Sequence, residues 1–260
     1  MMLDVGEYLS RLGLEPDHLE PSDEVLRILQ RRHLMTVPFE NLDIHWDRPI
    51  MLDVERFYRK IVIERRGGFC YELNGLFEQL LRAMGFRTRM VSARVFHDDG
   101  SIGPEFDHAA IIVTVGEDEY LADVGFGDFT TEPLRFSLGV EQHDASGVFV
   151  IRQFDDVYFE VAKCVGDGWK SEYLFQDVGH DLSDFAEMCD FQQHSPNSHF
   201  TKGRICSILT AEGRKTLTDT KFIVTFNGSR IGNDITSQEE FDDVLQREFN
   251  IQFSPATEVE

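Results

Sequence analysis

The chain has 260 residues, of which 42% are hydrophobic, enough to bury a large core shared by two or three sub-domains. It carries 47 acidic and 25 basic residues, which gives a formal net charge of -22 at pH 7. Nucleic acids and anionic membranes are bound by clustered Lys and Arg, so this composition excludes both as general partners.

The first third of the chain predicts helices. Ser22 caps a helix that begins with two acidic residues and turns Val25, Ile28 and Leu29 inward. Asp53 begins another helix, which continues to a glycine pair. A further helix follows the glycines, because one apolar stripe repeats with helical spacing at Leu73, Leu76, Phe77, Leu80, Leu81 and Met84.

From Thr88 the pattern changes to short strands separated by Gly- and Asp-rich turns. Five stretches predict strands, namely TRMVSARVF, HAAIIVTV, YLADVGF, VFVIRQF and VYFEVAK. Together they predict a small barrel or a curled sheet.

The last third mixes helices with strands. DLSDFAEMCDFQQH predicts a helix, and KFIVTFNGSRIG predicts a hairpin with an Asn-Gly turn. SQEEFDDVLQREF predicts a final helix, with Ser237 and Glu240 at the spacing of a capping box. The tail after Ser254 is expected to fray.

A cysteine directly precedes the apolar stripe, in the segment RRGGFCYELN. Cys70 is therefore expected at a helix N-terminus, where unpaired N–H groups and the macrodipole would lower the pKa of the thiol. Gly67 and Gly68 would leave room for backbone N–H groups to approach an oxyanion. The alternative is a small buried thiol beside an ordinary turn.

His108 and Asp123 lie on neighbouring predicted strands, an arrangement in which a carboxylate can orient a base. A turn centred on Glu117 and Asp118 would leave Asp123 about 13 Å from the position opposite His108. Direct opposition needs a turn centred between Val115 and Gly116. The spacing alone leaves both registers open.

The four cysteines, Cys70, Cys164, Cys189 and Cys206, form no C-x-x-C pair, and no disulfide framework is expected. A zinc site from Cys189, His194, His199 and Cys206 would match no common ligand spacing, so we expect no metal. No basic segment followed by an apolar one opens the sequence, and the longest aliphatic run, AAIIV, is too short to cross a bilayer. We therefore expect a soluble, cytoplasmic protein without a membrane partner.

Four segments together resemble the arylamine N-acetyltransferases: HLMTVPFENLDIH, RRGGFCYELN, FDHAAIIV and YLADVGFGDFTTEPLRF. They occur in the family's order over most of the first 136 residues. The resemblance implies an α+β, papain-like thiol-enzyme fold in three parts. These are a helical bundle carrying the nucleophile (1–86), a β-barrel domain carrying the histidine and aspartate (87–190) and a C-terminal α/β lid (191–260).

The resemblance also implies a catalytic triad of Cys70 as nucleophile, His108 as base and Asp123 as the group that orients the imidazole. Acetyl-CoA would acetylate Cys70, and an arylamine, arylhydrazine or N-hydroxyarylamine would then take the acetyl group in a ping-pong reaction. Acetyl-CoA would act as a co-substrate, and no permanently bound cofactor is implied.

Further residues match the family's motifs. The aromatic substrate would contact Phe39, Val95, Phe126 and Phe200.

CoA would contact the loop before His108 through Gly103 and Pro104. The phosphates of CoA also need basic groups, for which the candidates are Lys202, Arg204, Arg214 and Lys215. Polar groups among apolar neighbours are expected to form hydrogen bonds behind the site, at Glu40, Asn41, Glu72 and Asn74.

Three alternatives remain open at this level. A thiol hydrolase of the papain or transglutaminase type would use the same triad but pass its acyl group to water or lysine. A non-catalytic module would keep the fold with a buried thiol. A related acyltransferase or amide synthase would use another acyl donor. The sequence does not fix the physiological amine or the oligomeric state.

Overall fold

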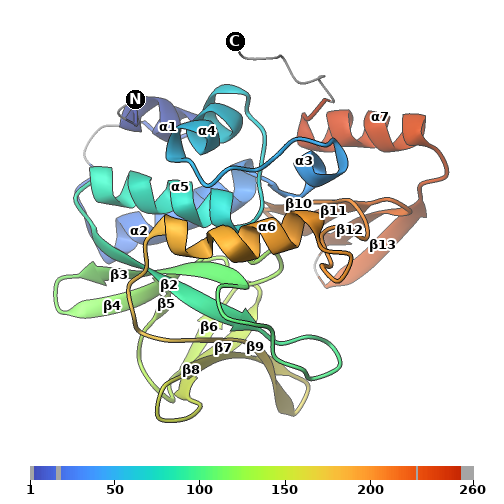
Figure 1. Cartoon of the computed structure of the whole chain (residues 1–260). Coiled ribbons are helices and arrows are strands. Elements are labelled where there is room, and N and C mark those ends of the chain that lie inside the picture. Colours follow the sequence, from blue (N-terminus) through green and yellow to red (C-terminus); the bar gives the residue numbers. More distant parts are fainter. Residues whose placement is uncertain (1–2, 16–18, 227, 253–260) are drawn as a thin grey trace.

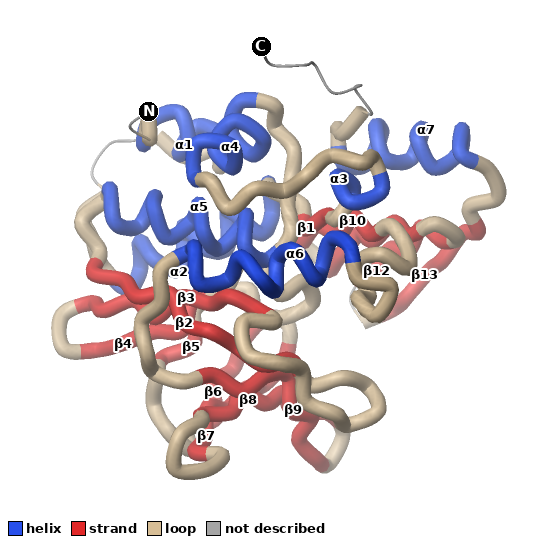
Figure 2. Tube along the Cα trace, viewed as in Figure 1, coloured by secondary structure: helices blue, strands red, loops and turns tan. Residues whose placement is uncertain are grey.

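The computed structural model describes residues 3–15, 19–226 and 228–252. Figure 1 shows a layer of helices above a curled sheet, with a smaller sheet and helix α7 beside them. The same view in Figure 2 shows α6 running along the boundary between these parts. The helices are α1 (Val5–Arg11), α2 (Asp23–Thr36), α3 (Leu42–His45), α4 (Val54–Tyr58), α5 (Cys70–Ala83), α6 (Ala186–His194) and α7 (Gln238–Phe249), with a π-helical turn at Arg59–Ile63 and a 3-10 turn at Leu182–Phe185.

The predicted helix starts are confirmed by their caps. Ser22 Oγ accepts a hydrogen bond from the Val25 N–H at 3.2 Å, and Asp53 Oδ1 accepts one from the Arg56 N–H at 2.9 Å. Such caps satisfy N–H groups that have no partner within the helix. Local side chains therefore fix where α2 and α4 begin.

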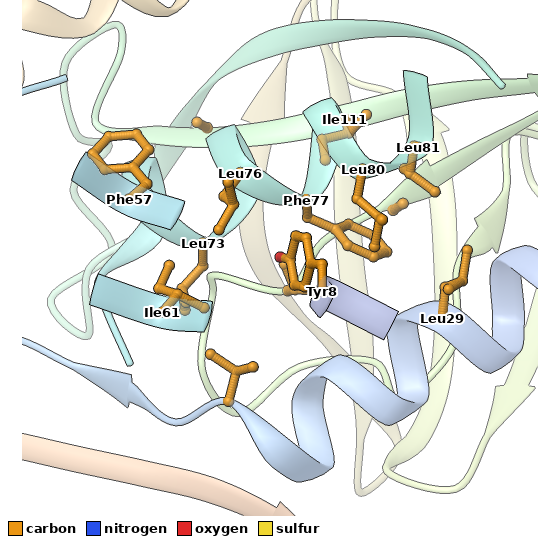
Figure 3. Close-up of a cluster of buried hydrophobic side chains, with 14 of the residues drawn as sticks. Tyr8, Leu29, Phe57, Ile61, Leu73, Leu76, Phe77, Leu80, Leu81 and Ile111 are labelled. Carbon is orange, nitrogen blue, oxygen red and sulfur yellow. The ribbon is translucent and has the colours of Figure 1, made fainter. Parts of the chain in front are cut away.

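Helix α5 is the centre of the largest apolar core. Its stripe is buried except for Met84, which is partly exposed, and Leu73, Phe77 and Leu80 pack in one cluster with Tyr8 of α1 and Leu29 of α2 (Figure 3). The same core includes Ile111 from the curled sheet. Packing between helices and sheet therefore holds α5 in place, including its first residue.

The curled sheet has eight antiparallel strands in the order β5-β4-β3-β2-β9-β8-β7-β6. Its edge strands β5 and β6 are joined through a side chain, because Gln142 accepts a hydrogen bond from the Arg135 N–H at 2.7 Å and donates one to the Arg135 carbonyl at 2.8 Å. This contact nearly closes the sheet into a barrel. The strands are β2 (Arg87–Val95), β3 (His108–Val115), β4 (Asp118–Ala122), β5 (Leu134–Arg135), β6 (Glu141–Asp144), β7 (Gly147–Gln153), β8 (Phe159–Val165) and β9 (Gly168–Phe175).

All five strands predicted for this sheet are present, as β2, β3, β4, β7 and β8, but β4 ends at Ala122, four residues before the end of the predicted segment YLADVGF. Strands β5, β6 and β9 were not predicted from the sequence. The first half of β9, with Lys170 and Ser171, is largely solvent-facing, so it lacks the apolar alternation of its neighbours. Its second half is buried and closes the barrel core.

The smaller sheet has the order β1-β10-β11-β12-β13 and packs against α7. The predicted hairpin is confirmed as β12 and β13, although Asn227 of its turn lies outside the described residues. Strand β1, from the first third of the chain, pairs with β10. The strands are β1 (Phe39–Glu40), β10 (Ile205–Thr210), β11 (Gly213–Thr218), β12 (Lys221–Phe226) and β13 (Ser229–Asp234).

Only half of the predicted capping box forms at the start of α7. Ser237 Oγ accepts a hydrogen bond from the Glu240 N–H at 3.1 Å, as expected. Glu240 Oε2, however, accepts from the Thr236 N–H at 2.8 Å rather than from Ser237. The Glu240 carboxylate therefore binds the N–H of Thr236 instead of the N–H of Ser237.

Three apolar clusters correspond broadly to the helices, the barrel and the smaller sheet. The division at residues 86 and 190 stays a prediction, and α6 runs across the second boundary. The expected fraying after Ser254 falls outside the described residues. Across the described ranges, every helix is too short or too polar to span a membrane.

Candidate active site

Cys70 is the first residue of α5, as expected, and only 3% of it is exposed. The preceding Phe69 is extended, with φ -98° and ψ -175°, and its N–H donates to Glu72 Oε2 at 3.1 Å. The glycines before it have a different role from the one expected. The Gly68 N–H donates to the Pro38 carbonyl at 3.3 Å, and a Cβ on Gly67 would lie 2.0 Å from that same oxygen. The glycine pair therefore lets this segment pack closely against the chain entering β1.

His108 opens β3, and its Nε2 lies 2.7 Å from Asp123 Oδ2. Both residues are buried, at 3% and 2% exposure. A carboxylate in this position can hold the imidazole in one orientation and stabilise its protonated form.

The register that allows this contact is neither of the two considered from the sequence. The β3–β4 turn is centred on Gly116 and Glu117, and Gly116 takes a left-handed φ of +61°. Continued pairing would place Asp123 opposite Ala110, but β4 ends one residue earlier. The chain leaves the sheet at Asp123, and its carboxylate reaches His108 from there.

Four donors hold the Asp123 carboxylate. Oδ1 accepts from Asn74 Nδ2 and from the Gly125 N–H, both at 2.9 Å. Oδ2 accepts from His108 and, at 3.4 Å, from the Tyr173 hydroxyl. The position of this carboxylate is therefore set by α5, by β9 and by its own loop.

Residues that flank Cys70 on α5 bind residues that flank His108 and Asp123. Asn74, one turn beyond the cysteine, donates to the Ala109 carbonyl at 2.6 Å and accepts from the Val124 N–H at 2.9 Å. Tyr71 donates to the Phe106 carbonyl at 2.7 Å. These bonds lock the start of α5 against β3 and against the loops before β3 and after β4.

A glycine makes the closest approach possible. A Cβ on Gly125 would lie 2.8 Å from Cys70 Cα and 2.7 Å from Asn74 Nδ2. Real Cβ atoms do not come so close to a backbone carbon. The loop that carries Asp123 therefore lies directly against the cysteine because residue 125 has no side chain.

The expected lowering of the Cys70 pKa is wrong. Burial raises the pKa of this thiol well above its usual value, and the nearby Asp107, Cys189 and Asp123 raise it further. The Tyr71 N–H acts in the opposite direction, and its effect is smaller. The cost of removing the thiolate from water therefore outweighs the effect of the helix N-terminus, and the thiol needs a nearby base that takes its proton.

Aromatic residues surround the triad candidates. The Phe126 ring meets the His108 ring edge-on at 5.2 Å between centroids, and Tyr173 lies on another side at 5.5 Å. The Phe200 ring lies 5.8 Å from Phe69 and 6.1 Å from Phe39. The structure thus brings Phe126 to the histidine, and Phe200 to both Phe39 and the residue before the cysteine.

The loop before His108 offers few free groups for an anion. The Gly103 N–H donates to the Val95 carbonyl at 2.8 Å, and Pro104 has no N–H to offer. The assignment of CoA contacts to Gly103 and Pro104 stays a prediction. Three of the basic candidates are already engaged, Arg204 with Asp219, Lys215 with Glu248, and Arg214 with the Gly127 carbonyl.

A buried cluster of charges supports the start of α5. Lys60 Nζ lies 2.9 Å from both Glu72 and Asp43, while Arg66 donates to Glu40 and Asp43 at 2.6 Å each. Two cations thus face three carboxylates. Burial raises the pKa of Glu72 to about 7; Lys60 opposes the rise, and the carboxylates of Asp43 and Glu40 add to it. Glu72 is the carboxylate that can protonate near neutral pH.

The polar residues expected behind the site do form hydrogen bonds. Glu40 accepts from the Leu42 N–H at 2.7 Å, and Asn41 Oδ1 accepts from the Ile205 N–H at 2.8 Å. Glu72 and Asn74 also form hydrogen bonds, to the Phe69 N–H and the Ala109 carbonyl. This expectation is confirmed.

Two residues of the network were not identified from the sequence, Gln30 of α2 and Tyr173 of β9. Gln30 is fully buried, and its Oε1 accepts from the Asp123 N–H at 3.1 Å. A lone glutamine in a helix and a lone tyrosine in an unassigned strand carry no motif, so only the fold reveals these roles.

Other features of the surface do not belong to this site. A hollow of about 560 Å³ is lined by residues of α2 and by Glu132, and a second of about 150 Å³ lies beside it near Arg135. Neither is lined by Cys70, His108 or Asp123. Among the residues described, no group of three or more His, Cys, Asp or Glu is arranged to hold a metal ion, including the four considered above.

A cysteine at a helix start, next to a buried histidine–aspartate pair, is the arrangement typical of thiol enzymes. A family model described as N-acetyltransferase matches residues 23–259. The arylamine N-acetyltransferase / N-hydroxyarylamine O-acetyltransferase of Salmonella typhimurium is 35% identical over 217 residues, which cover 83% of this chain and 76% of that protein. The chain belongs to the arylamine N-acetyltransferase family and is an acyltransferase.

Solved structures agree over nearly the whole chain. The arylamine N-acetyltransferase from Salmonella typhimurium has a TM-score of 0.90 at 30% identity and covers 98% of this chain and 96% of its own. The Mycobacterium marinum enzyme in complex with CoA has a TM-score of 0.88 at 29% identity, with 95% and 93% covered. The expected fold class is confirmed.

Proposed function

We propose that this acyltransferase moves an acetyl group from acetyl-CoA through a thioester on Cys70 to an arylamine, arylhydrazine or N-hydroxyarylamine. The observation that carries the proposal is the buried His108–Asp123 pair, which Asn74 fixes to the helix that begins with Cys70. Relatives named for arylamine acetylation, and one solved in complex with CoA, support the choice of substrates.

In the first half-reaction, His108 removes the thiol proton of Cys70. Because Nε2 faces Asp123, Nδ1 is the ring nitrogen that accepts this proton. The sulfur attacks the thioester carbonyl, the bond to the CoA sulfur breaks, and the imidazolium returns the proton to the departing thiolate. Cys70 is left acetylated.

In the second half-reaction, an amine nitrogen attacks the acetyl-Cys70 carbonyl. His108 takes a proton from the nitrogen and returns it to the sulfur of Cys70, which restores the thiol. Backbone N–H groups in the first turn of α5 are suited to stabilise the oxyanion in both steps. Two displacements through one sulfur give ping-pong kinetics.

The roles of the surrounding residues follow from their positions. Phe126, beside His108, and the pair Phe39 and Phe200, beside Phe69, would hold the aromatic acceptor, and Val95 would complete that pocket. Residues 191–260 would then act as a lid over the acceptor. We assign the protein to the cytoplasm, which the free thiols of all four cysteines support.

Mass spectrometry of the intact protein after mixing with acetyl-CoA alone tests the proposal. We expect one added acetyl group, located on Cys70 after digestion and lost when an arylamine is added. Cys164 is the exposed thiol and reports non-specific acetylation, so Cys164→Ser is the matched control. An adduct that decays equally fast with and without amine would identify a thiol hydrolase instead.

A further inference from the structure

A chain of hydrogen bonds through one glutamine connects the residue before the catalytic base with the backbone of Phe200. Gln192 of α6 is 6% exposed, and its Nε2 donates to Asp107 Oδ1 at 2.7 Å. Its Oε1 accepts from the Ser198 hydroxyl at 2.6 Å. Ser198 Oγ in turn accepts from the Phe200 N–H at 3.1 Å. The Ser198 hydroxyl also lies 3.0 Å from the Gln192 backbone carbonyl, and its contact with Oε1 is the shorter of the two.

The Asp107 end of this chain is anchored close to the nucleophile and the base. Asp107 directly precedes His108, and its carbonyl accepts from the Tyr71 hydroxyl at 3.2 Å. Its Oδ2 lies so close to Gly103 that a Cβ there would be only 2.4 Å away. Asp107 therefore cannot move without disturbing α5, β3 or the loop that carries Gly103.

The Phe200 end is held on its other side by the first third of the chain. The Phe200 carbonyl lies 3.0 Å from Asn41 Nδ2 and 2.9 Å from His45 Nε2. Two side chains therefore fix the carbonyl, while the N–H is fixed through Ser198 and Gln192. The orientation of the ring toward Phe39 depends on both sides of the residue.

We propose that Gln192 is a positioning residue that fixes Phe200 relative to His108, so that the acceptor amine meets the acetylated cysteine in the reactive orientation. This inference rests on the proposed function, since it assigns the acceptor side to Phe200. Glutamine suits the position because it donates to a carboxylate at one end and accepts from a hydroxyl at the other. Leucine can do neither, and an ionised glutamate can only accept.

Two substitutions remove the link in different ways. Gln192→Leu removes both side-chain hydrogen bonds and leaves the Ser198 hydroxyl only the backbone carbonyl of residue 192, 3.0 Å away, as an acceptor on α6. Gln192→Glu keeps the acceptor for Ser198 but places a second carboxyl group against Asp107, and the contact can re-form only when the two share a proton. The Gln192→Glu variant should therefore behave like wild type at low pH and like Gln192→Leu at high pH.

The matched control is the adjacent residue on the same helix. Gln193 accepts from the Ile50 N–H at 2.7 Å and donates to the Ile50 carbonyl at 3.0 Å, so it ties α6 to a different part of the chain. Gln193→Glu makes the same chemical change without touching Asp107 or Ser198. It should cost stability without a selective effect on the acceptor step.

Single-turnover kinetics between pH 5.5 and pH 8.5 separate the two half-reactions. Losing one buried hydrogen bond should slow transfer from acetyl-Cys70 to an arylamine by about tenfold. We expect this loss for Gln192→Leu at every pH and for Gln192→Glu only toward pH 8.5, while acetylation of Cys70 stays within about twofold.

Other titrating groups face the same pair, so each variant is compared with wild type at the same pH. His97 and His199 lie near Asp107, with their rings 5.4 Å apart, and His108 follows it in the chain. On α6 itself, Asp190 and His194 are paired with each other and exposed. These groups are common to all variants, and the ratio to wild type removes their contribution.

Hydrogen exchange provides a measure that does not depend on catalysis. The Phe200 N–H should exchange faster in Gln192→Leu than in wild type or in Gln193→Glu. Unchanged exchange, or equal slowing of both half-reactions, would overturn the role of Gln192. Failure of the wild type to become acetylated would instead overturn the proposed function, while the exchange result would still decide whether the link exists.

Discussion

Replacing Asp123 by asparagine should nearly abolish acetylation of Cys70, although the two side chains have the same shape. Donors face both oxygens of the carboxylate, Asn74 and Gly125 at Oδ1 and His108 and Tyr173 at Oδ2. An amide has only one oxygen, so its NH₂ group must face donors at one of the two positions.

The backbone decides which way the amide turns. The Gly125 N–H is fixed at 2.9 Å and cannot reverse its polarity, so the amide oxygen should take the Oδ1 position. The NH₂ group then faces His108 Nε2, which can accept this bond only if the ring proton moves to Nδ1. Nδ1 would then be unable to accept the thiol proton of Cys70.

The corresponding change in Ser-His-Asp triads lowers the rate about 10⁴-fold by fixing the wrong tautomer, or about 5.4 kcal/mol of activation free energy. We expect a similar loss here, measured as the rate at which acetyl-CoA alone acetylates Cys70. The variant should still fold, because asparagine keeps the volume of the aspartate side chain and at least three of its hydrogen bonds.

Asp144→Asn is the matched control. The Asp144 carboxylate also accepts several bonds in a loop, including those from Thr131 and Ser146, but it contacts no histidine. The Asp144→Asn variant should be acetylated at a rate within about twofold of wild type, because substitutions away from the active site rarely change the rate of the chemical step. If Asp123→Asn loses less than about tenfold, the tautomer argument fails and Asp123 is not the orienting group.

Cys70→Ala should fold normally and form no acetyl adduct, and intact mass spectrometry of this variant beside Cys164→Ser checks this; an adduct on the alanine variant would mean that another thiol is the nucleophile. Glu72→Gln should flatten the pH dependence of stability. Because the pKa of this acid is about 7 when folded and 4.5 when unfolded, the folded protein binds the proton more tightly, so the unfolding free energy should fall as pH rises between those values, by up to about 3 kcal/mol. Urea unfolding at several pH values measures the slope, and a slope that survives in the variant would assign it to another group. Phe200→Ala should slow acceptor transfer by about tenfold to a hundredfold, for about 1 to 3 kcal/mol of lost contact, with acetylation nearly unchanged; equal slowing of both steps in single-turnover experiments would place Phe200 outside the acceptor side.

Features encoded by near neighbours in the chain could be predicted. The starts of α2, α4 and α5 follow from Ser22, Asp53 and the apolar stripe after Cys70, and the structure confirms them. In each case the signal spans only a few residues. The helix that carries the candidate nucleophile was therefore accessible from the sequence.

Features that depend on tertiary contacts or on burial were either missed or predicted wrongly. The contact between His108 and Asp123 forms because β4 ends at Ala122, and no pattern in the strand announces that end. The pKa of Cys70 was predicted in the wrong direction because position on a helix says nothing of burial. Tyr173 was missed because it lies 50 positions from Asp123 in a strand with a polar first half.

The pairing of β1 with β10 sets the order in which the protein can be completed during synthesis. Asn41, next to β1, binds Ile205, which lies 164 positions later in the chain. At a ribosomal rate of about 5 to 20 residues per second, roughly 8 to 30 seconds separate the appearance of the two partners. The helix bearing Cys70 is made early, and Gly68 can pair with one side of β1 at that stage, but the side that faces β10 stays unpaired until the final third of the chain emerges. A nascent chain that stops before residue 205 would therefore expose the edge of β1, which makes this strand the point at which an interrupted product is open to misfolding or to capture by chaperones.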